Sequence, residues 1–262
     1  MKAVGKALIF SALAGMSMAS QAYTVTDTYI GGDDHGHGDV IGDPNYFDIF
    51  GADVSFNGSM VTIDIFTNFT SSPAVGSFSG LTNSGLDDQG IGLGDLFLSN
   101  SYTPDTSNGT LNDNATTGNV WTYGLTVDDR YLTSSTGGTS QLYALDAGDN
   151  DANAYLSDDY LSAGTFRNNQ EVAVDVDSLT NNLPVSSGTW LADDTNGKIT
   201  FSFDAAGTNL FDSGDLAFHW AMLCGNDVIE GVVSTPTQVS EPSVIALFGL
   251  GLFGLGLARR RA

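Results

Sequence analysis

Positive charge is scarce in this sequence, and most of it lies at the two ends. Eight Lys and Arg residues face 31 Asp and Glu residues in a chain of 262, which gives a formal net charge of −23. Between residues 23 and 240 only Arg130, Arg167 and Lys198 stand against thirty acidic residues, a formal charge of −27. Such a surface repels nucleic acid and anionic lipid, which argues against both as partners of this part of the chain.

Cysteine and glutamate are almost absent as well. Cys224 is the only cysteine, so no intrachain disulfide can form, and the preceding Ala221-Met222-Leu223 predicts that it is a small buried apolar residue. Only three of the 31 acidic residues are Glu. Asp favours turns and oxygen-ligand loops over helices. Stability must therefore come from an apolar core, to which bound metal would add.

Long amphipathic helices are missing from the middle of the chain, where short alternating runs replace them. Apolar residues alternate with polar ones at 61–69, 172–176, 199–203 and 216–222. A period of two with one apolar face indicates antiparallel strands that cover a core. The sequence therefore predicts an all-β domain, an antiparallel β-sandwich with a jelly roll among the arrangements that fit.

Turn residues support this prediction. Asn57-Gly58 and Asn196-Gly197 each separate two alternating runs, and Asn-Gly suits the positive φ angles of a tight hairpin. The apolar parity slips by one around Gly51, which predicts a β-bulge there.

The N-terminus has the three parts of a secretory signal peptide. Lys2 and Lys6 precede an apolar stretch over residues 7–18, and Ser20-Gln21-Ala22 forms a small-x-small pattern. This order predicts a signal helix over residues 1–22, with cleavage between Ala22 and Tyr23.

The C-terminus carries a second apolar segment. Fifteen uncharged residues, 244–258, follow Ser240-Glu241-Pro242 and precede Arg259, Arg260 and Arg261. As a helix the run would be about 22 Å long, short of the ~30 Å hydrocarbon core but adequate as a temporary anchor. The arginines would stay on the cytoplasmic side.

A Glu-Pro motif, a Leu/Gly-rich apolar run and a terminal arginine cluster resemble the PEP-CTERM tail of Gram-negative bacteria. The family's motif is Pro-Glu-Pro, and Ser240 replaces its first proline. The resemblance covers only about 24 residues and implies processing by an exosortase, transient insertion in the inner membrane, and release to the outer surface or extracellular matrix. The expected organisation is a signal peptide (1–22), a β-sandwich (23–233), a linker (234–239) and a sorting and anchoring tail (240–262).

Two acidic loops are candidates for binding metal. The first, residues 31–43, combines glycines with Asp33, Asp34, Asp39 and Asp43, and its backbone would wrap closely around a calcium ion. Zinc fits less well, because only His35 and His37 supply nitrogen nearby. The alternative is a solvated loop that leads into the first hairpin.

The second loop contains Asp149, Asp151 and Asn153, which imitate the first three ligand positions of an EF-hand. Ala154 and Tyr160 stand where that motif needs Gly and Glu, so the EF-hand fails and a calcium loop of a β-domain or a plain solvated loop remains.

No catalytic or cofactor-binding residue is assigned. The chain has no nucleophile elbow, zinc-protease motif or phosphate loop. Trp190 is the best candidate for an exposed sugar-stacking ring. His219 could serve as a catalytic base, but its strand neighbours favour a structural or surface role. We expect a non-enzymatic, surface-directed protein that binds calcium and associates with exopolysaccharide or the cell envelope. The alternatives are a glycan-active enzyme that uses two carboxylates and a purely structural matrix protein.

Overall fold

The computed structural model describes residues 21–27, 39–71, 74–75, 90–103, 118–146, 153–161 and 166–236. Within these ranges the strands are β1 (Gln21–Thr26), β2 (Ile49–Asn57), β3 (Met60–Thr67), β4 (Leu96–Ser99), β5 (Tyr123–Leu125), β6 (Gly137–Ala144), β7 (Ala154–Leu156), β8 (Glu171–Val174), β9 (Ser186–Asp193), β10 (Lys198–Asp204), β11 (Asp215–Ala221) and β12 (Val228–Ser234). Three single-turn helices accompany them, α1 (Pro44–Phe47), α2 (Ser157–Tyr160) and the 3-10 turn η1 (Val176–Ser178). The all-β prediction is confirmed.

The two predicted terminal helices lie outside the described ranges. Among the residues that are described, no helix is long and apolar enough to cross a membrane. The predicted cleavage site between Ala22 and Tyr23 falls inside β1, so a chain cut there would keep Tyr23–Thr26 of that strand.

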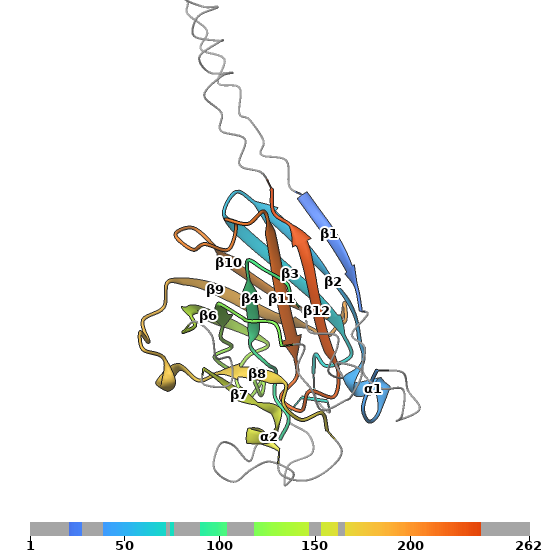
Figure 1. The fold of residues 1–262 in the computed structure, drawn as a ribbon. Coiled ribbons are helices and arrows are strands. Elements are labelled where there is room, and N and C mark those ends of the chain that lie inside the picture. Colours follow the sequence, from blue (N-terminus) through green and yellow to red (C-terminus); the bar gives the residue numbers. More distant parts are fainter. Residues whose placement is uncertain are drawn as a thin grey trace, which may run out of the picture.

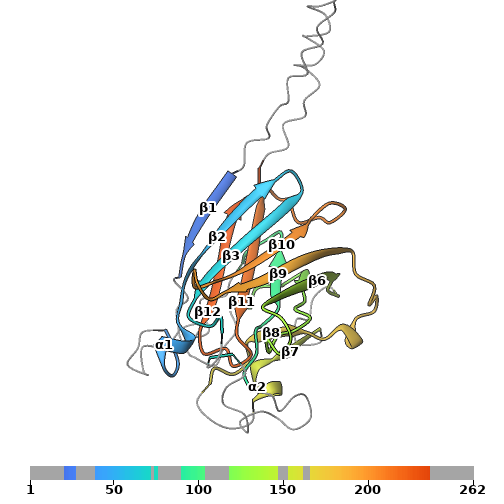
Figure 2. The same cartoon turned by 180° about the vertical axis from the view of Figure 1, so that it is seen from behind.

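Ten strands form one antiparallel sheet in the order β1-β2-β3-β10-β9-β6-β5-β4-β11-β12. The sheet curls until its two edge strands contact each other. As a result β11 and β12 face β2 and β3 across the core (Figures 1 and 2). The approach at this seam is close, because a Cβ added to Gly231 of β12 would lie 2.7 Å from a methyl carbon of Val25 in β1. The result is a sandwich-like, nearly closed barrel.

The interior is filled by every second residue of the strands, as the alternating runs predict. Val61, Ile63 and Ile65 of β3 are completely buried, and their partners Phe203 and Phe201 on β10 are buried beside them. Burying one such side chain contributes about 1.5–3 kcal/mol, so the apolar core replaces the missing disulfides.

The first hairpin is confirmed, with its turn one residue later than Asn-Gly itself. Asn57 still pairs with Met60, so Gly58 and Ser59 form the two-residue turn, and Gly58 takes the positive φ of 63°. The predicted bulge is also present, since the β2–β3 register shifts between Ile49 and Gly51. The second hairpin closes through Gly197, with φ of 59°.

A small second sheet of β7 and β8 covers the outer face of the main sheet. Val174 of β8 lies directly over Gly124 of β5, where a Cβ would come within 2.3 Å of its side chain. Buried Asp95 joins the layers, because it accepts the backbone N–H of Val174 (2.8 Å) and pairs with Arg130 (3.2 Å). A cluster that includes Phe97 and Trp121 fills the space between the sheets.

Gly94, just before β4, lies closer to a neighbouring backbone than the other described glycines. Its carbonyl accepts the indole N–H of Trp220 at 3.1 Å, and an added Cβ would lie 1.8 Å from the carbonyl oxygen of Ala221. No side chain fits at this position unless β4 moves away from β11.

Gly94→Ala should therefore destabilise the domain by about 3 kcal/mol, at the upper end of the overpacking range. Gly207→Ala is the matched control, because its Cβ would meet nothing within 4 Å and only the positive φ of 82° is strained, which costs about 1–2 kcal/mol. Chemical denaturation of both variants measures the difference. Equal losses would mean that the approach of Gly94 to Ala221 is not limiting.

Candidate metal centre

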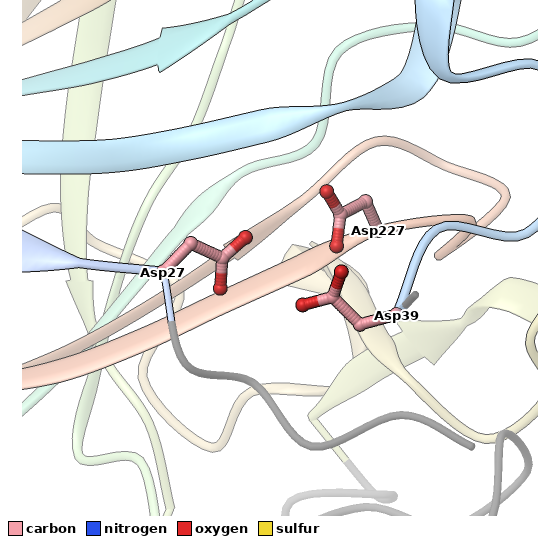
Figure 3. A group of neighbouring side chains, drawn as sticks. All are labelled: Asp27, Asp39 and Asp227. Carbon is pink, nitrogen blue, oxygen red and sulfur yellow. The ribbon is translucent and has the colours of Figure 1, made fainter. Parts of the chain in front are cut away.

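Three aspartates from distant parts of the sequence converge where the sheet closes. Asp27 follows β1, Asp39 precedes α1, and Asp227 lies in the turn before β12 (Figure 3). One carboxylate oxygen of each lies within 4.8 Å of those of the other two. The cluster therefore links the first and last strands of the sheet at the seam.

Asp227 is the buried member of this cluster. Its Oδ2 accepts the backbone N–H of Ile49 at 2.6 Å, and its Oδ1 accepts that of Val228 at 2.9 Å. Loss of solvation raises its pKa well above the usual value, and the negative charges of Asp27 and Asp39 raise it further. An empty cluster therefore favours a proton on Asp227, and a bound cation would compete with that proton.

Arg167 brings one positive charge to this site. Its side chain is completely buried, and one of its nitrogens donates to the backbone carbonyl of Asp39 at 2.5 Å. The same charge lowers the pKa of Asp227 and partly offsets the burial. Three ionised carboxylates and one guanidinium leave a local charge of about −2, which a divalent cation would neutralise.

The donor set suits calcium in both type and spacing. Calcium binds six to eight oxygens at about 2.3–2.6 Å, so two ligand oxygens on opposite sides of one ion lie about 4.8 Å apart. Carboxylate oxygens from Asp27, Asp39 and Asp227 meet this limit. Structural zinc sites are built from cysteine and histidine ligands, which these three residues do not supply.

The structure places the sequence-predicted ligands in different roles. Asp39 belongs to the cluster. Asp43 does not, because it caps α1 by accepting the N–H of Asn45 at 2.9 Å. Asn153 is buried and accepts the N–H of Asp146 at 2.7 Å, which closes its own loop. The other predicted ligands lie outside the described residues: Asp33, Asp34, Asp149 and Asp151.

Sequence reasoning missed Asp27 and Asp227. Each stands at the end of a strand, Asp27 directly after β1 and Asp227 directly before β12. A carboxylate next to an alternating run is the only local signal, and it is weak in a chain with 31 acidic residues. The pairing of both strands in one curled sheet is what brings the side chains together.

Trp190 corrects a prediction. It is not an exposed sugar-binding platform, because only 2% of its surface is accessible and its indole N–H donates to Asp128 at 2.6 Å. Its neighbour Leu191 occupies the outer face of β9 instead and is 47% exposed. Because Trp190 and Leu191 are adjacent and both apolar, the sequence alone does not decide which of them faces inward. In the structure the larger side chain, Trp190, does.

His219 forms a buried ion pair on the outer face of β11, as a structural role requires. Its Nδ1 lies 3.0 Å from Glu230, and its Nε2 lies 2.8 Å from the carbonyl oxygen of Glu171. Tyr102 donates to the second oxygen of Glu230 at 3.0 Å, and the ring of Trp121 covers the imidazole. Both ring nitrogens face acceptors, so the doubly protonated form satisfies both contacts.

The fold and this cluster define an antiparallel β-sandwich with a carboxylate site at its seam. Residues 238–261 match the PEP-CTERM protein-sorting motif. The chain thus carries the sorting signal of an exported, surface-directed protein, which implies processing by an exosortase. Comparison with curated proteins and with solved structures gives no match.

The first prediction for this region concerns His219. Burial alone would lower its pKa, but the hydrogen bond and charge of Glu230 outweigh burial and raise it. The stabilisation is complete below the unfolded pKa of about 6.5 and is lost as pH rises through the higher folded value. His219→Leu should destabilise the protein by about 3–5 kcal/mol near pH 6, since Glu230 loses its buried partner.

Chemical denaturation between pH 5 and pH 9 checks this expectation. Replacing both partners, His219→Leu with Glu230→Leu, is the control and should recover part of the loss. A loss below about 1 kcal/mol in the single variant would contradict a buried ion pair.

A second prediction uses the raised pKa of Asp227. Its folded pKa exceeds the unfolded value of about 3.9, so its contribution to stability is fully present below that value and is lost as pH rises through the folded pKa. In chelator, Asp227→Asn should remove this part of the pH dependence, because the amide does not ionise. Melting curves across pH 4–8 test it, and an unchanged pH profile in the variant would contradict the assignment.

Proposed function

We propose that this protein is an exported, non-enzymatic β-sandwich that acts at the cell surface or in the extracellular matrix and is stabilised there by calcium bound at Asp27, Asp39 and Asp227. The observation that supports this proposal is the convergence of the three carboxylates on the seam between β1 and β12. A cation at this point would hold the two edges of the sheet together.

Export makes the choice of cation reasonable. Calcium sites of extracellular modules bind in the range of about 10⁻⁴–10⁻³ M, and this affinity is reached with few charged ligands. Asp27 and Asp39 are half-buried, so water molecules would complete the coordination of an ion beside buried Asp227. Calcium would then bind after the chain has left the cytoplasm, as part of folding at its destination.

The proposed partners are exopolysaccharide or other components of the envelope. The sorting tail directs the chain outward, and the strongly acidic surface would join anionic polymer only through bridging cations. Binding to isolated matrix polysaccharide with calcium and with chelator tests this association. Absence of binding in both conditions would contradict the proposed association with polysaccharide.

One observation favours the competing function, a glycan-active enzyme. A carboxyl group with a raised pKa beside other carboxylates is the arrangement that glycoside hydrolysis needs, and Asp227 meets that description. Its burial and its two backbone hydrogen bonds argue against a role as a proton donor to a substrate. Hydrolysis of a polysaccharide that is lost in Asp227→Asn would favour the enzyme.

The main experiment is thermal melting of the exported protein with calcium, magnesium or chelator. At calcium one hundred times above the dissociation constant, preferential binding to the folded state contributes about 2.7 kcal/mol. For a domain of about 200 residues this raises the melting temperature by roughly 5–10 °C. Magnesium should have a smaller effect, because it demands near-ideal octahedral geometry and loses water reluctantly.

Asp39→Asn and Asp227→Asn should each abolish the calcium shift. Asp43→Asn is the matched control, because asparagine still caps α1 and the position lies outside the cluster. Identical melts in calcium and chelator would remove the calcium proposal. A shift that survives in both cluster variants would place the calcium site elsewhere.

A further inference from the structure

Both ends of the folded domain leave it at the same pole, defined here as the tail pole. Gln21 pairs with Phe56 beside the β2–β3 turn, and the ring of Phe56 contacts that of Phe211 in the segment after β10. The same segment receives the end of β12, because Thr235 donates its N–H to the carbonyl of Gly214 at 2.8 Å. Figures 1 and 2 show the start of β1 and the end of β12 at one end of the sheet.

The opposite end of the sheet, defined here as the acidic pole, holds α1, α2 and the metal-centre candidate. Backbone hydrogen bonds connect its parts: Ile41 donates to Asn226, Arg167 to Cys224, and Thr67 to Gly197. β3 and β10 run between the poles, so the β2–β3 turn and the β9–β10 turn lie at opposite ends of neighbouring strands. The eight residues of β3 separate these turns by about 25 Å.

Negative charge is distributed unequally between the two poles. The described aspartates of the acidic pole are Asp27, Asp39, Asp43, Asp48, Asp158, Asp159, Asp193, Asp194 and Asp227. Those of the tail pole are Asp204, Asp212 and Asp215. Arg167 and Lys198 at the acidic pole reduce the difference without removing it, because they leave seven excess formal negative charges there against three, and six when Asp227 holds a proton. A bilayer surface with anionic lipids therefore repels the acidic pole more strongly.

We propose that the tail pole faces the lipid surface while the protein is anchored, and that the acidic pole points away from the membrane. The apolar segment of the sorting tail, residues 244–258, connects to the domain at the tail pole, and the signal peptide connects at the same pole until it is cleaved. The attachment of the tail at one pole, and charge repulsion at the other, favour the same orientation. The inference goes beyond the proposed function and holds whether or not the site binds calcium.

The chain is well suited to a site-directed labelling test. Cys224, its only cysteine, is buried, and burial raises the pKa of its thiol to about 12, so it does not react at neutral pH. Asn57→Cys at the end of β2, next to the β2–β3 turn, reports on the tail pole, and Thr195→Cys in the β9–β10 turn reports on the acidic pole. Both positions are exposed and lie in or next to a hairpin turn, which makes them a matched pair.

The full chain with its tail is placed in vesicles of zwitterionic and anionic lipids, and each cysteine carries the same fluorophore. Lipids with a spin label on the headgroup quench fluorophores near the surface. We expect the label at position 57 to be quenched at least threefold more strongly than that at position 195. Vesicles without the spin-labelled lipid provide the baseline. Equal quenching at the two positions, or stronger quenching at 195, would overturn the proposed orientation.

Discussion

Repulsion between carboxylates is the constraint that the rest of this structure depends on. The part of the chain between the two terminal segments has three Lys and Arg residues, and each is placed where acids would otherwise destabilise the fold. Arg130 pairs with buried Asp95 where the second sheet joins the first. Lys198 pairs with Asp64, which lies directly opposite Asp53 on the neighbouring strand. Arg167 lies at the seam. Like charges that face each other across a sheet lower stability. Moving one of these three cations elsewhere on the surface would therefore destabilise the fold.

Where no cation is available, backbone N–H and hydroxyl groups solvate the acids. Asp129 accepts from the backbone and hydroxyl groups of Thr133 and Ser134, and these bonds hold its pKa far below the usual value although burial acts in the opposite direction. Asp128 accepts the indole N–H of Trp190 in the same region. Asp is better suited to this than Glu, because its short side chain reaches the adjacent backbone. The predominance of Asp among the acidic residues therefore follows from how the fold accommodates its charge.

Local features were predictable from the sequence, and features that depend on closure of the sheet were not. Gly58 and Gly51 indicate the hairpin and the bulge, because tight turns and irregular pairing need the conformations that glycine allows. Asp39 was found through its glycine-rich surroundings. Asp27 and Asp227 were not, because two hundred residues separate them and only the contact between β1 and β12 brings them together. Trp190 shows the same limit, since which of two adjacent apolar residues faces inward is decided by the register of the whole sheet.

The seam also constrains when the sheet can close during folding. β1 is the first and β12 the last of the described strands, so the sheet cannot close before the whole domain has been synthesised. Pairings of such long sequence separation form slowly, because the cost of closing the intervening loop precedes the gain from contact. The cluster of Asp27, Asp39 and Asp227 assembles at this same step, which brings three negative charges together just as the last edge docks. A proton or a cation must then enter, and whichever does so determines how firmly the first strand is held.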